Sequence, residues 1–251
     1  MPSSVIVVPC YNEAKRLDAQ SFVAAAQGDP SLTFLFVDDG SRDATRSLLG
    51  ELRDQHPAHF SVLGLDQNRG KAEAVRLGMQ SAFDRSPELV AYFDADLATP
   101  LAELTPMRAL FGDRPELQVA LGSRVGLLGR DVVRTPHRHY MGRVFASLAS
   151  LLLDLHVYDT QCGAKVFRNT EAVRGVFATP FSVRWTFDVE VLARLAQLAR
   201  DGAIAPLERS AMEYPLRRWR DVSGSKLGPA AALQAGTELA TLWRKYGRFR
   251  A

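Results

Sequence analysis

The sequence predicts an α/β protein with a mostly parallel sheet, helices on both faces of that sheet and a helical extension at the C-terminus. Two observations carry this prediction. In residues 1–125, continuous apolar runs alternate with segments in which apolar residues recur at helical spacing. Uninterrupted apolar strands separated by helices are typical of a parallel sheet that is covered on both sides. After residue 125, the long apolar segments have helical character.

Five apolar runs in the first half predict the strands. They cover residues 4–9, 33–37, 60–65, 89–93 and 119–121. Helices are predicted between them at residues 13–27, from Ser41 to residue 55, at residues 70–83 and at residues 101–111. Ser41 is placed at the start of the second helix because a serine hydroxyl caps the free N–H groups of a first turn.

The second half is predicted to be mainly helical. Helices are expected at residues 140–155, 186–200 and 230–246, a short strand at residues 166–167 and an extended segment at residues 204–216. Basic residues at the end of the last helix complement its dipole. No internal repeat or Pro-, Gly- and Ser-rich linker divides the chain. We therefore expect one domain over residues 1–228, with halves at 1–125 and 126–228, followed by a C-terminal helix and basic tail at 229–251.

The composition is that of a globular protein. The 251 residues are 47% hydrophobic and 24% charged, which excludes a disordered chain, a collagen or a long coiled coil. Two cysteines cannot build a disulfide framework, and this favours a reducing setting. The sequence shows no signal-peptide pattern, and no apolar run reaches about 18 residues. These features predict a cytoplasmic protein without a membrane-spanning helix.

Basic residues gather in two segments, although the net charge is only +3. The segments are residues 124–143 and 217–251, and they indicate either a phosphate-bearing partner or solvated surface charge. No nucleic-acid-binding motif accompanies them, so we expect no nucleic-acid partner. The helix at residues 140–155 has an apolar side and a basic lead-in. It fits a peripheral contact with the cytoplasmic membrane face, and equally well a helix packed on the sheet or between subunits.

Polar residues follow four of the predicted strands directly. They form the segments 9–13, 38–43, 68–71 and 94–96. Because the carboxyl ends of parallel strands meet at one edge, these segments are expected to line one cleft. The Asp94-Ala95-Asp96 sequence suits Mg²⁺ or Mn²⁺ held together with a bound diphosphate. The phosphate-loop, dinucleotide and zinc motifs are missing from the sequence, which argues against those three classes of site.

These segments resemble, in order and spacing, the motif set of the family 2 glycosyltransferases with the GT-A fold. The matching motifs are Pro9-Cys10-Tyr11-Asn12-Glu13, Asp38-Asp39-Gly40-Ser41-Arg42-Asp43, Asn68-Arg69-Gly70-Lys71 and Asp94-Ala95-Asp96-Leu97. Three later motifs are similar to the polyprenyl-phosphate branch, above all to dolichyl-phosphate β-glucosyltransferases and next to the mannosyltransferases. They are Gly122-Ser123-Arg124, the stretch from Asp159 to Lys165, and the stretch from Arg184 to Glu190. The resemblance covers about residues 4–228.

The sequence departs from that branch in two places. It lacks the N-terminal membrane anchor that is usual for the glucosyltransferases, and Ala164 replaces the aromatic residue of their C-G-F-K motif. The first difference puts membrane residence in doubt. The second is expected to reshape the acceptor side of the site.

The resemblance implies a donor site for a nucleotide-diphosphate sugar. Pro9, Tyr11 and Glu13 would line the base and ribose pocket. Asp39, and alternatively Asp38 if it is not a turn cap, would accept a hydrogen bond from the base. Lys71 would lie near the diphosphate, or else be an exposed lysine at a helix start. Asp94 and Asp96, with Ala95 between them at the donor, would hold Mg²⁺ or Mn²⁺.

The resemblance also implies an acceptor site. The candidates to hold the acceptor phosphate are Arg124, Arg130, Arg134 and Lys165. Asp159 would be a catalytic or sugar-orienting carboxylate. Trp185 and Asp188 would contact the sugar, with core packing as the alternative for Trp185. The residues expected to act in catalysis are Asp96, Asp159 and Arg124.

The implied reaction is an inverting transfer of a hexose, with UDP-glucose the favoured donor, to a polyprenyl phosphate. A phosphate monoester carries about −1.5 to −2 charge near neutral pH. It is therefore already a nucleophile, which agrees with the lack of an obvious Ser–His arrangement. Three alternatives stay open: a GDP-mannose-dependent enzyme, a soluble family 2 enzyme with a sugar or metabolite acceptor, and a nucleotide-sugar-binding protein of the membrane surface without activity.

Overall fold

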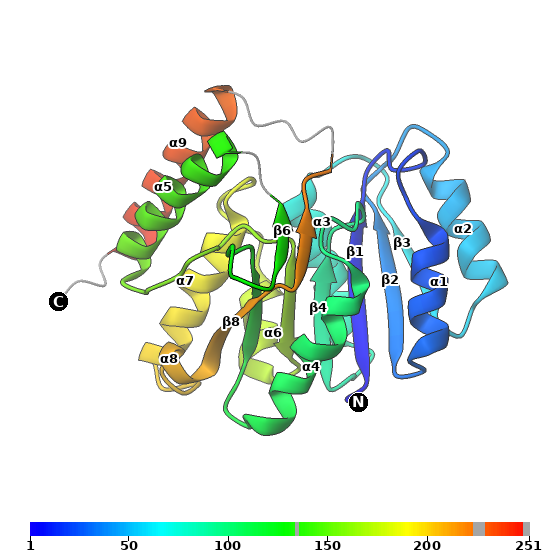
Figure 1. Cartoon of the computed structure of the whole chain (residues 1–251), viewed down its shortest axis with the longest axis horizontal. Helices are drawn as coiled ribbons and strands as arrows, with labels where there is room; N and C mark the ends of the chain where they lie inside the picture. Colours follow the sequence, from blue (N-terminus) through cyan, green and yellow to red (C-terminus); the bar gives the residue numbers. More distant parts are fainter. Residues whose placement is uncertain (134–135, 223–228, 248–251) are drawn as a thin grey trace.

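A mixed sheet forms the centre of the molecule. The computed structural model describes residues 1–133, 136–222 and 229–247. In this part of the chain, a seven-stranded sheet has the order β3-β2-β1-β4-β7-β5-β8, and β6 pairs with β9 in a second small sheet (Figure 1). All neighbours are parallel except β7, which runs antiparallel to both β4 and β5. The predicted mostly parallel sheet is confirmed.

The strands are short apolar segments, as the sequence predicts for the first half. The large sheet contains β1 (Ser4–Cys10), β2 (Leu32–Asp38), β3 (Phe60–Gly64), β4 (Leu89–Phe93), β5 (Val119–Ser123), β7 (Ala164–Arg168) and β8 (Ala211–Pro215). The small sheet contains β6 (Asp131–Val133) and β9 (Arg218–Arg220), which the sequence analysis missed. β8 lies inside the segment predicted to be extended.

The helices cover both faces of the large sheet. They are α1 (Ala19–Gly28), α2 (Thr45–Gln55), α3 (Lys71–Phe83), η1 (Leu101–Glu103), α4 (Leu104–Asp113), α5 (Pro136–Leu153), α6 (Glu171–Ala178), α7 (Phe187–Arg200), α8 (Leu207–Ser210) and α9 (Pro229–Tyr246). Alternate side chains of β1 enter opposite cores. Val5 and Val7 pack with α3, α6 and α7, whereas Ile6 and Val8 pack with α1, α2 and α4.

Two predicted helix starts are wrong. The first helix begins at Ala19, after Asp18 accepts a hydrogen bond from the Ser21 N–H at 3.2 Å. Ser41 does not cap the second helix, which begins at Thr45. The Ser41 hydroxyl instead accepts the backbone N–H of Asn12 at 3.0 Å. Asn12 and Ser41 thereby connect the loops that follow β1 and β2.

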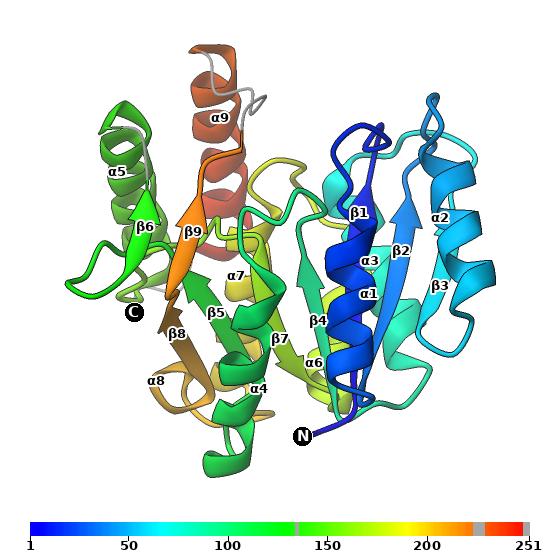
Figure 2. The ribbon, with the colours of Figure 1, turned by 45° about the vertical axis from the view of Figure 1, so that its right-hand side comes forward.

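α5 and α9 form an arm beside α7, at the far end of the molecule from α2 (Figures 1 and 2). Ala149 and Leu152 of α5 share the apolar core with Leu239 and Leu242 of α9. In the described ranges, no helix is both long enough and apolar enough to cross a membrane. In Figure 2, the carboxyl ends of the parallel strands lie towards the top of the molecule, and the upper half of this arm lies there as well.

Candidate functional site

The loops that follow β1 and β2 are bound to each other. Asn12 has a positive φ of 55°, and its Oδ1 accepts the Arg42 N–H at 2.9 Å. Glu13 accepts two hydrogen bonds from Arg16, at 2.6 and 3.0 Å, while its own N–H binds the Thr45 hydroxyl at 2.8 Å. Pro9 is half-buried near the end of β1, Cys10 after it is buried, and Tyr11 is 39% exposed. The predicted donor-side segments 9–13 and 38–43 are therefore held together.

Asp38 and Asp39 are neighbours with different surroundings. Asp38 is fully buried, and its carboxylate accepts the Ser41 N–H at 3.1 Å and the Arg46 Nε–H at 2.7 Å. Asp38 therefore caps the turn, which is the alternative role that the sequence analysis gave for it. Asp39 accepts the N–H groups of Arg69 and Gly70 at 2.7 and 2.8 Å. Burial raises the pKa of Asp39 even though these two N–H groups act to lower it.

The two carboxylates after β4 lie together with Lys71. The Lys71 Nζ is 2.5 Å from Oδ1 of Asp94, and Asp96 accepts the Ala98 N–H at 3.1 Å. Burial, and then the charge of Asp94, raise the pKa of Asp96. Ala95 between them is buried in the core. Two close carboxylates are a donor set that a hard divalent cation accepts.

The chain is shaped to leave room for Asp94. A Cβ atom at Gly163 would lie 2.0 Å from Oδ2 of Asp94, so any larger residue there would displace this carboxylate. No group of three or more His, Cys, Asp or Glu residues that could hold a metal is found in the parts described. The two carboxylates would then have to share a cation with ligand oxygen atoms or water, as is usual for Mg²⁺.

Arg124 and Asp159 form a two-point ion pair. Nε and Nη2 of Arg124 lie 2.6 and 2.8 Å from the two carboxylate oxygens, and the Arg124 backbone N–H donates at 3.0 Å. The guanidinium lies 5.3 Å from the centre of the Trp219 ring. Burial disfavours its charge, but Asp159 outweighs burial and raises the pKa of Arg124. Glu213 fixes the position of Asp159, because its Oε1 accepts the Asp159 backbone N–H at 2.8 Å.

One short segment joins these two clusters. It begins at Asp159, and its end at Gly163 accepts the Asp94 N–H on the carbonyl oxygen at 3.1 Å. Residues 159–163 therefore bring the Asp94 carboxylate close enough to the Arg124 guanidinium for its charge to act on the pKa of Arg124.

Lys165 and Asp188 form a buried ion pair with each other. Lys165 is fully buried, and its Nζ donates to Oδ1 of Asp188 and to the Cys162 carbonyl, each at 2.6 Å. The Tyr92 hydroxyl donates to the same Asp188 oxygen at 2.5 Å. Both side chains therefore bind protein groups in this structure, and the contacts of Lys165 with the acceptor phosphate and of Asp188 with the sugar stay predictions. Side chains alternate along a strand, so Lys165 lies on the same face of β7 as Phe167, which packs in the core with α7.

Trp185 directly follows Arg184, which binds the Arg69 carbonyl at 3.2 Å. It is 40% exposed, so the core-packing alternative is wrong for this residue. Arg130 lies directly before β6, and its backbone N–H binds the Leu127 carbonyl at 3.1 Å. Arg134 lies outside the described residues.

Three supporting residues were missed by the sequence analysis. Arg184 binds the Arg69 carbonyl at 3.2 Å and stands 3.0 Å from the place of a Cβ at Gly70. Glu213 and Trp219 hold Asp159 and Arg124 from β8 and β9. Arg184 was inside a recognised motif and could have been found. The other two are far along the chain from their partners, and no local pattern marks them.

Comparison with known proteins agrees with the resemblance. The model of the family "Glycosyl transferase family 2" matches residues 5–172. A dolichyl-phosphate beta-glucosyltransferase of Drosophila melanogaster is 35% identical, over 96% of this chain and 74% of that protein. The one of Homo sapiens is 32% identical, over 96% and 75%.

Solved structures agree on the fold. A mannosyltransferase from Pyrobaculum calidifontis, in complex with GDP-Man and Mn²⁺, has a TM-score of 0.66 at 18% identity, over the whole of this chain and 65% of that one. A glucosyl-3-phosphoglycerate synthase from Mycobacterium tuberculosis, with Mn²⁺, UDP-Glc and phosphoglyceric acid, has a TM-score of 0.64 at 17% identity, over 98% and 80%. Both confirm the predicted GT-A fold. With the family model spanning most of its length and relatives matching nearly all of it, the chain belongs to glycosyl transferase family 2.

Proposed function

We propose that this protein transfers glucose from UDP-glucose to a polyprenyl phosphate such as dolichyl phosphate, with inversion at the anomeric carbon. The observation that carries the proposal is the single segment that links the Asp94–Asp96 carboxylates to the Arg124–Asp159 ion pair. A donor diphosphate and an acceptor phosphate need binding groups on adjacent sides of one cleft. The names of the curated relatives support both the sugar and the lipid.

The donor side would use the residues at the ends of β1, β2 and β4. Pro9, Tyr11 and Glu13 would line the base and ribose pocket. Asp39 alone would accept the base N–H, because the Asp38 carboxylate is buried and holds its own turn. Asp94 and Asp96 would hold Mg²⁺ or Mn²⁺, which when bound neutralises charge on the leaving diphosphate. Lys71 would move from Asp94 to a diphosphate oxygen.

The acceptor side would centre on Arg124. Arginine has five N–H donors, and Asp159 takes one side of the guanidinium in a two-point contact. The remaining N–H groups suit phosphate oxygens, which guanidinium binds in a two-point geometry. The acceptor phosphate is itself the nucleophile, so Asp159 would orient Arg124 and the sugar and would not remove a proton. Arg130, Arg134 and Trp185 would add contacts at the edge.

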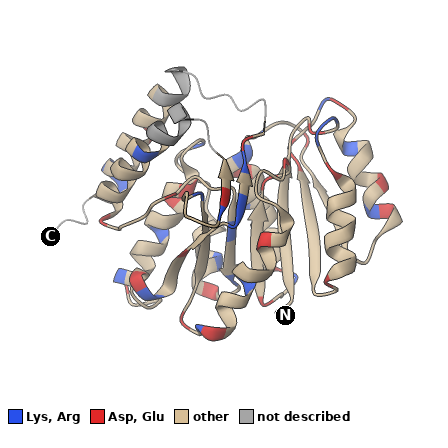
Figure 3. Ribbon diagram, viewed as in Figure 1, with Lys and Arg blue, Asp and Glu red and all other residues tan. Residues whose placement is uncertain are grey.

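A peripheral membrane contact belongs to this proposal, since the acceptor carries a lipid chain. Val144, Leu148 and Leu151 lie on one side of α5 and are 50–60% exposed. Leu128, in the loop before β6, is fully exposed. The arm of α5 and α9 is mainly uncharged, with isolated basic positions (Figure 3). An apolar helix face with basic neighbours suits the surface of an anionic bilayer.

A transfer assay tests the proposal. Labelled UDP-glucose and labelled GDP-mannose are offered separately to a short polyprenyl phosphate, and to phosphoglycerate as a soluble phosphate acceptor. We expect organic-phase label from UDP-glucose that EDTA abolishes and Mg²⁺ or Mn²⁺ restores. If only GDP-mannose gives label, the transferred sugar is mannose and the proposed donor is wrong. If label appears only in a soluble product, the proposed lipid acceptor is wrong.

A further inference from the structure

The last helix, α9, is bound to the start of α7 by one carboxylate. Oε2 of Glu238 accepts the backbone N–H groups of Trp185 and Thr186 at 2.9 and 2.8 Å, and the Thr186 hydroxyl at 3.0 Å. Its Oε1 accepts the Gln234 side chain at 2.9 Å. Thr186 precedes α7 and makes no capping hydrogen bond with its own side chain. A carboxylate near the positive end of a helix is also favoured by the helix dipole.

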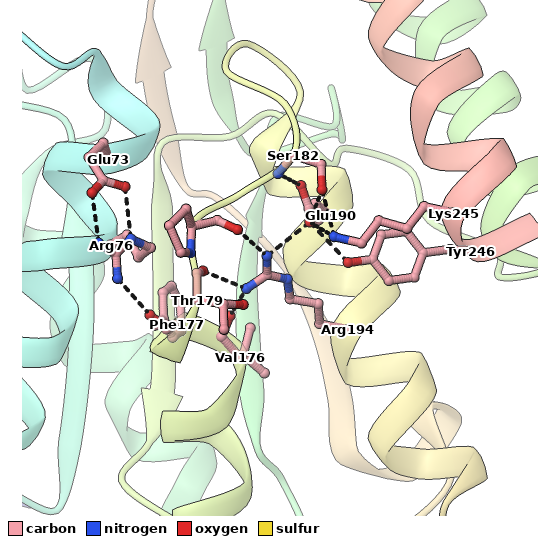
Figure 4. Close-up of polar contacts among 11 residues, drawn as sticks. Glu73, Arg76, Val176, Phe177, Thr179, Ser182, Glu190, Arg194, Lys245 and Tyr246 are labelled. Carbon is pink, nitrogen blue, oxygen red and sulfur yellow. Dashed lines mark hydrogen bonds and ion pairs between the residues drawn. The ribbon is translucent and has the colours of Figure 1, made fainter.

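The far end of α9 is bound to the same helix through Glu190. Glu190 is fully buried, and its Oε1 accepts the Tyr246 hydroxyl at 2.9 Å and the Lys245 Nζ at 3.2 Å (Figure 4). The same carboxylate accepts the Ser182 N–H at 2.6 Å and Arg194 Nη2 at 2.9 Å. Arg194 in turn binds the carbonyl groups of residues 176, 179 and 180 (Figure 4).

These contacts fix the segment between α6 and α7 at both of its ends. Glu190 and Arg194 hold its beginning, and Glu238 holds its last residues. Trp185 is in this segment, with its side chain 40% exposed, and it directly follows Arg184, which binds the Arg69 carbonyl at 3.2 Å. Asp188, which pairs with Lys165, follows in the first turn of α7. The backbone of Trp185 has no strand or helix of its own to define its position.

We propose that Glu238 is a positioning residue for the acceptor side of the site, acting through the backbone of Trp185 and Thr186. The inference rests on the proposed function, because it takes Trp185 to be an acceptor-side residue. The C-terminal helix then belongs to the working enzyme as a support that sets where the indole stands. The donor side is held mainly by contacts among the loops after β1, β2 and β3, and its link to this segment is the hydrogen bond from Arg184 to the Arg69 carbonyl at 3.2 Å.

The test compares Glu238→Ala, Glu238→Gln and Thr241→Ala. Thr241 is the matched control, because it is exposed on the same helix and donates only to the Thr237 carbonyl. In Glu238→Ala, we expect the KM for polyprenyl phosphate to rise about tenfold, as loss of hydrogen bonds to a charged group allows. The dissociation constant of UDP should change much less, because only the Arg184 contact with the Arg69 carbonyl links this segment to the donor side in the described residues. Glu238→Gln keeps an acceptor oxygen and should recover part of the loss.

Amide hydrogen exchange separates positioning from unfolding. The amides of Trp185 and Thr186 should exchange faster in Glu238→Ala, while those of α3 keep their protection. Unchanged exchange at these two amides, or an equal loss of donor and acceptor affinity, would overturn the inference. If the unaltered protein transfers nothing to polyprenyl phosphate, the proposed function fails, and the positioning inference fails with it, whatever the exchange shows.

Discussion

Arg124 and Asp159 lie side by side in a two-point ion pair, with Nε 2.6 Å and Nη2 2.8 Å from the carboxylate oxygens. The carboxylate also accepts the Arg124 backbone N–H, so side chain and main chain are fixed by the same partner. A buried guanidinium held in this way keeps one orientation before any ligand arrives. This preorganisation is what the proposed phosphate site requires.

Replacing Asp159 by Asn should weaken transfer through the acceptor. The variant keeps the size of the side chain but leaves Arg124 without its charge partner. We expect kcat/KM for polyprenyl phosphate to fall about 100-fold, in line with removal of one partner of a buried ion pair. Steady-state kinetics measure this fall in kcat/KM, and the dissociation constant of UDP serves as the control. A fall confined to UDP affinity would place the ion pair on the donor side.

Replacing Lys71 by Met should strengthen metal binding to the donor-free protein. Burial opposes the charge of Lys71, but Asp94 and then Asp188 outweigh it, so the pKa of its ammonium is raised. The ammonium 2.5 Å from Asp94 competes with a cation for that carboxylate. We expect the Mn²⁺ affinity to rise severalfold, measured by electron paramagnetic resonance without donor, while transfer from UDP-glucose falls. An unchanged Mn²⁺ affinity would mean that Lys71 does not compete for Asp94.

Replacing Gly163 by Ala should displace the Asp94 carboxylate, which we propose holds the cation, without unfolding the protein. The new methyl group would stand 2.0 Å from Oδ2 and 2.3 Å from Cγ of Asp94. Asp94 must then move, and we expect at least about a tenfold loss of transfer activity, since small displacements in a site cost that much. Gly175→Ala is the control, because α6 leaves open space there, and it should be neutral or stabilising. Equal activity of the two variants would argue against a role for Asp94.

The stability of the protein should fall in acid because of Glu190. Burial favours the neutral acid, but hydrogen bonds from Arg194, Tyr246 and Ser182 outweigh it and lower the pKa of Glu190 below 4.5. A lowered folded-state pKa adds stability at pH values above about 4.5, and this is lost as the pH falls through the folded value. Glu190→Gln should reduce the free energy of unfolding by about 3 kcal/mol near neutral pH and should flatten this acid dependence. Thermal unfolding between pH 7 and pH 3.5 measures both effects, and an identical pH slope in the variant would contradict the assignment.

Adding a charge to the exposed face of α5 should weaken membrane binding. Leu148 is 51% exposed between Val144 and Leu151, so Leu148→Glu places a carboxylate in the middle of the apolar strip. We expect flotation with anionic liposomes at low salt to fall severalfold. Ala109→Glu adds the same charge on the exposed side of α4 and serves as the control. If the unaltered protein does not float with the liposomes, or if Leu148→Glu floats as well as Ala109→Glu, the strip is not a membrane surface.

Local sequence patterns predict the first half of the fold well. The apolar runs of β1 to β5 and the helical spacing of α3 needed no knowledge of the rest of the chain. The common edge of the motifs followed from the parallel arrangement alone. The reversed direction of β7 could not be predicted, because an apolar run has the same pattern in a parallel and an antiparallel strand. β6 and β9 are three residues each and give no periodic signal.

Side-chain roles were harder to predict where partners are distant in sequence. Ser41 has the properties of a helix cap, yet Asn12, 29 residues away, takes its hydroxyl. Lys165 has the charge that a phosphate site needs, but its partner Asp188 lies 23 residues further on and buries it. Glu238 binds residues 52 and 53 positions before it. Each outcome depends on tertiary packing, which the residue type does not reveal.

The linkage in the product tests the central claim most directly. The lipid product made from UDP-α-glucose and a short polyprenyl phosphate would be purified, and its anomeric proton and phosphorus coupling recorded by NMR. We predict one glucosyl phosphate with β configuration, as a single in-line displacement by the acceptor phosphate requires. An α-linked product would contradict the inverting mechanism, and free glucose without a lipid product would contradict the acceptor.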